Sequence, residues 1–141
     1  MEVSRAIVCA VMACVAAEAA PAAQRAMPTL AALDKVEAGL WEVHAPGAPA
    51  HNICVADPAA LTQVRHGGAA CARLVISDDA SGATVHYSCR GAGWGRTSVR
   101  AASPTSVRID TQGIADNAPF AFVAEARRIG ACGAVRTSLV R

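Results

Sequence analysis

The 141-residue chain has few aromatic residues and only one lysine. Aromatic residues make up 4% of the sequence, and the formal net charge is +2. So small a charge argues against a nucleic acid as a partner, because nucleic-acid-binding domains carry a strongly basic surface. The hydrophobic fraction is 53%, but much of it is alanine, which buries little surface per residue. We therefore expect one small domain with a thin core and not a large enzyme scaffold.

The sequence also lacks an apolar run long enough to form a transmembrane helix. The longest run covers residues 6–17, whereas a spanning helix needs roughly 18–20 apolar residues. Arg5 precedes this run, and Ala-x-Ala sites follow at residues 17–19 and 20–22, which is the pattern of a secretory signal. We expect residues 1–22 to be a cleaved signal peptide, so that the protein is periplasmic or secreted. A lipoprotein signal ending at Cys14 is the alternative, although Met12 suits it poorly.

The rest of the chain divides into a linker over 23–38, one β-rich domain over 39–133 and a C-terminal tail over 134–141. Short runs with the period of a strand alternate with turn residues and predict strands at 39–44, 51–55, 74–76, 84–87, 94–101, 105–111 and 120–127. Asp57 followed by Pro58 predicts one short helix over 57–64. The expected fold is mainly β: an antiparallel meander that forms a partly open barrel or a sandwich, stapled by disulfides.

Removal of the signal peptide leaves four cysteines, Cys54, Cys71, Cys89 and Cys132. Residues 77–82 favour a turn, and a turn centred on Ala80 places Cys71 directly opposite Cys89. A disulfide between these two leaves Cys54 and Cys132 as the second pair. A metal site of four thiolates is the alternative, but the closest two of these cysteines are 17 positions apart, whereas zinc sites use much closer pairs. We predict no metal and no other cofactor.

The histidines do not show the spacing of a metal site or a catalytic site. None forms an i, i+4 pair on the predicted helix or a His-x-His pair on a strand, and the chain has no Gly-x-Ser-x-Gly elbow. His66 follows the predicted helix, where a cation suits the helix C-terminus. An envelope hydrolase or metal-dependent enzyme that uses His44, His51 or His86 is the alternative function, and it requires two of these three to meet in a cleft.

The chain combines a Gly39-Leu40-Trp41-Glu42 start, Cys54 ahead of the short helix, the Cys71–Cys89 hairpin and a late Gly130-Ala131-Cys132. In this order the features resemble a family of small exported proteobacterial proteins known as a domain of unknown function. The resemblance covers about residues 36–132, and the chain departs from the family in its short, proline-rich segment after Val43. It implies export and a β fold, and it implies no catalytic residues because the family has no established activity.

We expect a non-enzymatic domain that binds a small or apolar ligand, or an envelope partner, on the concave face of its sheet. The aromatic residues that are candidates to line this face, or else to fill the core, are Trp41, Tyr87, Trp94, Phe120 and Phe122. A third possibility is an interaction module that accepts a partner strand at an open sheet edge. An exposed, unpaired edge strand favours this possibility, and a closed barrel excludes it.

The intact mass of the protein recovered from a bacterial periplasm tests the export prediction. We expect the denatured mass to fit a chain that begins after residue 19 or residue 22 and has four oxidised thiols. A full-length mass would contradict the signal peptide. Four free thiols would contradict the disulfides and favour the thiolate metal site.

Overall fold

A computed structural model describes residues 29–133 of the chain. The predicted signal peptide, the first part of the predicted linker and the predicted tail lie outside the described residues. The described residues form one sheet of seven antiparallel strands and two short 3₁₀ helices. The elements are η1 (Ala31–Leu33), β1 (Gly39–His44), β2 (His51–Val55), η2 (Pro58–His66), β3 (Cys71–Asp79), β4 (Gly82–Cys89), β5 (Gly93–Ser103), β6 (Ser106–Ala115) and β7 (Ala118–Gly130). The mainly β, antiparallel prediction is confirmed, and of its two forms the single open sheet excludes the sandwich.

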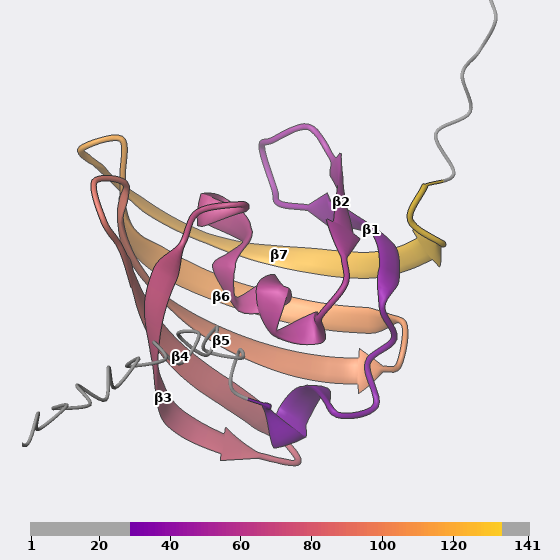
Figure 1. Ribbon diagram of the computed structural model, residues 1–141. Coiled ribbons are helices and arrows are strands. Elements are labelled where there is room, and N and C mark those ends of the chain that lie inside the picture. Colours follow the sequence, from indigo (N-terminus) through magenta and orange to yellow (C-terminus); the bar gives the residue numbers. More distant parts are fainter. Residues whose placement is uncertain (1–28, 134–141) are drawn as a thin grey trace, which may run out of the picture.

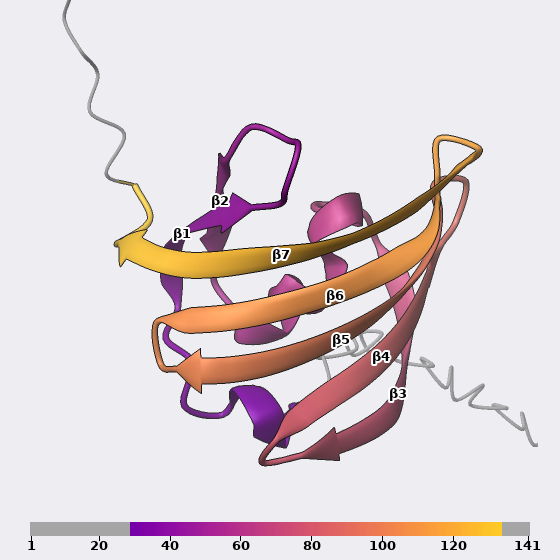
Figure 2. The ribbon, with the colours of Figure 1, turned by 180° about the vertical axis from the view of Figure 1, so that it is seen from behind.

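The strands are arranged in the order β2-β1-β7-β6-β5-β4-β3. Strands β3 to β7 form the predicted meander, and β1 pairs antiparallel with β7. Because β2 and β3 lie at opposite edges of the sheet, the chain between them has to cross the sheet. It crosses on the concave face as η2 (Figure 1). The outer, convex face of β3 to β7 is not covered by a helix of the described chain (Figure 2).

The core forms where the inward residues of the strands meet the two helices. Alternation along β6 places Val107, Ile109 and Thr111 inward, and all three are buried. Trp41 of β1 is completely buried, and its indole N–H donates to the carbonyl of Glu37 at 3.1 Å. The core also contains inward valines of the other strands and buried leucines of the helices, listed as Val43, Val55, Val85, Val99, Leu33 and Leu61.

The packed domain begins earlier than the sequence predicted, because part of the expected linker belongs to the core. Leu30, Leu33 and Val36 recur at intervals of three, which matches the turn of a 3₁₀ helix, and all three are buried. The Asp78 carboxylate accepts hydrogen bonds from the backbone N–H groups of Ala31 and Ala32 at 2.7 and 3.0 Å. These bonds attach η1 to the end of β3.

The predicted short helix is present as η2. The Asp57 side chain accepts from the N–H of Ala59 at 2.9 Å, and Pro58 occupies the first helical position. The helix is 3₁₀ and is kinked at Gln63, where φ is −128° and ψ is 30°. It therefore fits the curve of the sheet beneath it and buries Leu61 and Thr62 completely.

The hairpin and both disulfides are as predicted. Cys71 is opposite Cys89, and Val75 is opposite Val85. Beyond Val75 the register shifts, so that Ile76 forms a bulge before the turn. The bonded pairs are Cys54–Cys132 and Cys71–Cys89.

Such disulfides are typical of proteins that are located in an oxidising compartment outside the cytoplasm. Across residues 29–133, no helix has the length and apolar character required to cross a membrane.

Removal of each disulfide is expected to destabilise the domain by a different amount. The sequence separations are 78 for Cys54–Cys132 and 18 for Cys71–Cys89. The chain-entropy relation then gives losses of about 4.5 and about 3 kcal/mol, because the longer crosslink restricts the unfolded chain more. Urea unfolding of the two double alanine variants measures the difference. A larger loss for the Cys71 and Cys89 pair would contradict this prediction.

Candidate functional site

The five predicted aromatic residues do not line one surface. Trp41 and Tyr87 are completely buried and belong to the core. Phe120 and Phe122 are half-buried on the inward side of β7, and Phe122 packs against the core. Trp94 is 40% exposed and lies on the outer face of β5. Of the five, therefore, only the two phenylalanines lie where a ligand on the inner side can approach.

The prediction that Trp94 lies on the concave face is wrong. The glycines on either side of it occupy the inward positions of β5. Alternation along β5 places Gly93 and Gly95 inward and Trp94 outward. A Cβ atom at Gly95 would overlap the ring and hydroxyl of Tyr87. Glycine at this position allows the large Tyr87 side chain to pack beneath the strand, and so Trp94 is left facing outward.

The concave face of the sheet is not an open binding surface, because η1 and η2 cover most of it (Figure 1). A hollow of 370 Å³ remains beside η2, bounded by the loop between β1 and β2 and by β7. We call it the β1–β2 hollow. Its inner wall is formed by Val43, Val64 and Phe122. Its volume falls within the roughly 300–1,000 Å³ that is typical of small-molecule sites.

The opposite wall of the hollow is the short proline-rich loop between β1 and β2. Val43 and His51 form the last paired position of the two strands. Pro46 and Pro49 both line the hollow, and proline cannot supply the N–H that would continue the strand pairing. The loop turns at Gly47, where φ is +78°, a conformation that favours glycine. The sequence predicted a break in the strand here, but gave no signal that the loop would form a wall of a cavity.

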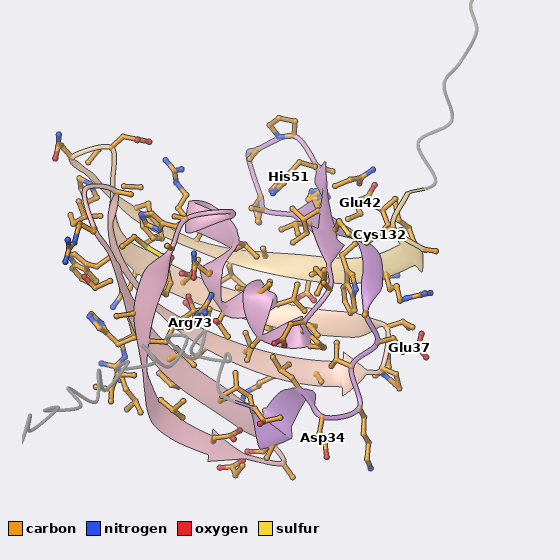
Figure 3. All side chains as sticks on the ribbon, in the orientation of Figure 1. Asp34, Glu37, Glu42, His51, Arg73 and Cys132 are labelled. Carbon is orange, nitrogen blue, oxygen red and sulfur yellow. A yellow bond between two sulfur atoms is a disulfide. The ribbon has the colours of Figure 1, made fainter. Side chains whose placement is uncertain are left out.

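Two basic residues, Arg65 and His51, are the only titratable side chains that line the hollow. His51 lies at the start of β2, beside the loop (Figure 3). The Arg65 guanidinium carbon lies 5.8 Å from the centre of the Phe120 ring, and one N–H donates to the Asp116 carboxylate at 3.3 Å. The Phe120 and Phe122 rings are 6.0 Å apart. The apolar surface of the hollow thus continues through Phe122 to the Phe120 ring, and the Arg65 guanidinium lies over that ring.

A buried polar network holds the end of η2 against the sheet. His66 Nε2 lies 2.9 Å from the carbonyl oxygen of Ala92, and its Nδ1 lies 3.0 Å from the Tyr87 hydroxyl. Because a carbonyl can only accept, the Nε2–H group of His66 donates to Ala92. His66 thus lies at the end of η2, as its position in the sequence predicted, and it is buried there with both ring nitrogens bonded.

Gln63 and Arg73 extend this network across to β3. The Gln63 amide donates to the carbonyl oxygens of His66 and Ala69 at 2.8 and 2.9 Å. Arg73 of β3 donates to the Gln63 side-chain oxygen (Figure 3). Burial lowers the pKa of the Arg73 guanidinium. These bonds fix the helix turn that carries Val64 and Arg65 into the hollow.

The three histidines proposed for the enzymatic alternative lie in three different places. His44 lines a hollow on the outer side, beside the ion pair between Arg108 and Glu125. His51 lines the β1–β2 hollow, and His86 lies against Trp94 with ring centres 5.6 Å apart. Within residues 29–133 there is also no cluster of three His, Cys, Asp or Glu side chains that could hold a metal ion. The structure therefore gives no catalytic geometry to these histidines.

The edge strand β3 is the main feature that supports partner binding. In the described sheet it pairs only with β4. Its outer side carries Leu74 and Ile76, which are 64% and 47% exposed. The bulge at Ile76 interrupts the strand, so the regular part of the edge is Cys71–Val75.

Comparisons with protein-family models, with curated proteins and with solved structures find no match to this chain. The functional argument therefore depends on the geometry of the molecule itself.

The Tyr87 phenol is expected to titrate at higher pH in the folded protein than in the unfolded one. Burial raises its pKa, whereas in the unfolded chain the pKa is about 10. The stability that comes from the neutral phenol is present below pH 10 and is lost as the pH rises through the folded pKa. Tyr87 is the only tyrosine in the chain, so phenolate absorbance reports on it alone. Equal midpoints with and without denaturant would contradict the burial of this hydroxyl.

Proposed function

We propose that this protein is an exported, non-enzymatic binding protein that takes a small apolar ligand into the β1–β2 hollow. The observation that carries the proposal is the composition of this site. Apolar walls from β1, η2, β7 and the proline-rich loop enclose 370 Å³, and two basic residues lie among them. A mostly apolar cavity with a few polar groups is the usual form of a small-molecule site.

The location follows from two independent features. The disulfides indicate an oxidising compartment, and residues 1–22 have the pattern of a cleaved signal peptide. Together they support the proposal that the protein binds its ligand in the periplasm or in the surrounding medium. A ligand with low solubility in water benefits from a carrier in such a compartment.

A second candidate function is capture of an extended strand of an envelope protein at β3. Its support is the open edge and the exposed Leu74 and Ile76. The hollow is the better supported site, because the bulge at Ile76 limits the regular edge to Cys71–Val75, and edge bulges commonly discourage strand addition. The hollow, in contrast, is formed jointly by four segments of the chain.

Binding of the neutral fluorescent probe N-phenyl-1-naphthylamine tests the proposal. We expect the wild-type protein to bind it and Ala48→Asp to weaken binding by at least about tenfold, because a carboxylate placed against apolar walls loses hydration. Ala48 lines the hollow and is exposed on the loop, so the substitution leaves the core unchanged.

Leu74→Asp is the matched control, since it also places a carboxylate at an exposed position but on the outer face. We expect it to leave probe binding unchanged. If Leu74→Asp abolishes binding and Ala48→Asp does not, the outer surface is the binding site and the hollow is not. Absence of binding to the wild-type protein would also overturn the proposal.

A further inference from the structure

We propose that the ligand of the β1–β2 hollow is an anionic amphiphile with a single chain, whose head group binds Arg65. This inference rests on the proposed function and adds the chemical class of the ligand. The apolar part would lie between Phe122 and the proline-rich loop, and the anionic head, a carboxylate in the simplest case, would lie at the basic end of the hollow.

The charged residues around the hollow favour a ligand whose head group is negatively charged. Of the residues that the structure describes, Arg65 and His51 contribute basic groups to the lining and no carboxylate lines the hollow. The nearest acid in contact with Arg65 is Asp116, which pairs with it at 3.3 Å and does not line the hollow. A cationic head group at this site would therefore meet a guanidinium of like charge, whereas an anion would meet one of opposite charge.

The geometry of Arg65 leaves it able to bind an anion. The structure shows one of its N–H groups bonded to Asp116, and a guanidinium has five in a planar fork that matches a carboxylate. In this ion pair the Asp116 side chain is 87% exposed and the Arg65 side chain 41% exposed, and exposed ion pairs are weak. The contact with the Phe120 ring holds the cation in place. A ligand carboxylate can thus replace Asp116 or bind beside it.

The apolar surface leads directly to that cation. Phe122 lines the hollow, its ring lies 6.0 Å from that of Phe120, and Phe120 lies under the guanidinium. A molecule that follows these two rings places its end at Arg65. The volume of 370 Å³ is near the lower end of the roughly 300–1,000 Å³ range of ligand sites. It suits one short chain or ring better than the two chains of a diacyl lipid.

Displacement of N-phenyl-1-naphthylamine by three ligands that share a decyl chain length tests the inference. The ligands are decanoate, decanol and decyltrimethylammonium. The two ionic ligands are used below their micelle concentrations and decanol below its solubility limit. We expect decanoate to bind about tenfold more tightly than decanol, because it adds charge-assisted hydrogen bonds, and decyltrimethylammonium to bind most weakly. Arg65→Gln should reduce the affinity for decanoate to that for decanol and leave the affinity for decanol unchanged.

Three further variants sharpen the test. Arg65→Lys should restore part of the preference for decanoate, because it keeps the charge. Asp116→Asn should strengthen decanoate binding, because it removes the competing carboxylate. Arg96→Gln is the matched control on the outer face of β5, where the arginine is also exposed, and it should have no effect.

The outcomes separate this inference from the proposed function. If decanoate and decanol bind equally, or if Arg65→Gln changes neither, the anionic class is wrong while an apolar ligand in the hollow still stands. Tighter binding of decyltrimethylammonium than of decanoate would also overturn the inference. If the wild-type protein binds neither the probe nor any of the three ligands, the proposed function itself is wrong.

Discussion

The pairing of β1 with β7 is the constraint on which the rest of this structure depends. It joins the first strand of the sheet to the last, with Val43 opposite Ala126, and it places β2 at one edge. The meander places β3 at the other edge, so the chain that links them must pass over the concave face. This passage is η2, which fills most of the space that a curved sheet would otherwise leave for a ligand. The hollow beside η2 is what remains between the crossing and the β1–β2 loop.

The core has few large side chains, and buried polar groups add to the apolar packing that keeps η2 against the sheet. His66, Gln63 and Arg73 are bonded to Tyr87, to backbone carbonyls and to one another. Satisfied buried polar groups specify one arrangement, since each is costly to leave without a partner. In an alanine-rich domain, packing alone specifies the arrangement of the chain less strongly, so these hydrogen bonds contribute to it as well. Arg65, one of the two basic residues of the hollow, lies on the helix that is fixed in this way.

Local patterns predicted much of the fold from the sequence. The Cys71–Cys89 register followed from turn residues at 77–82, and the start of η2 followed from Asp57 and Pro58, because each signal acts within a few residues. The pairing of β1 with β7 has no such signal, since it joins segments that lie far apart in the chain. The position of Trp94 was wrong because its face depends on the space that Tyr87 takes beneath Gly95. The hollow was missed for the same reason: its walls come from four separate segments. Of its lining residues, only Phe122 was predicted to contact a ligand, and His51 was named for the enzymatic alternative.

A sheet whose first strand pairs with its last also determines when the chain can fold. Trp41 in β1 is buried only once β7 is in place, and β7 comes at the end of the domain. A growing chain that lacks β7 can form the hairpin of β3 and β4, but it cannot close its core, and such long-range contacts form late. The same order makes Cys132 the last of these cysteines to be synthesised, so Cys54 meets Cys71 and Cys89 before its own partner is available. A chain that still lacks β7 therefore leaves the inward residues of β1 exposed, which makes β7 the strand whose arrival completes the domain.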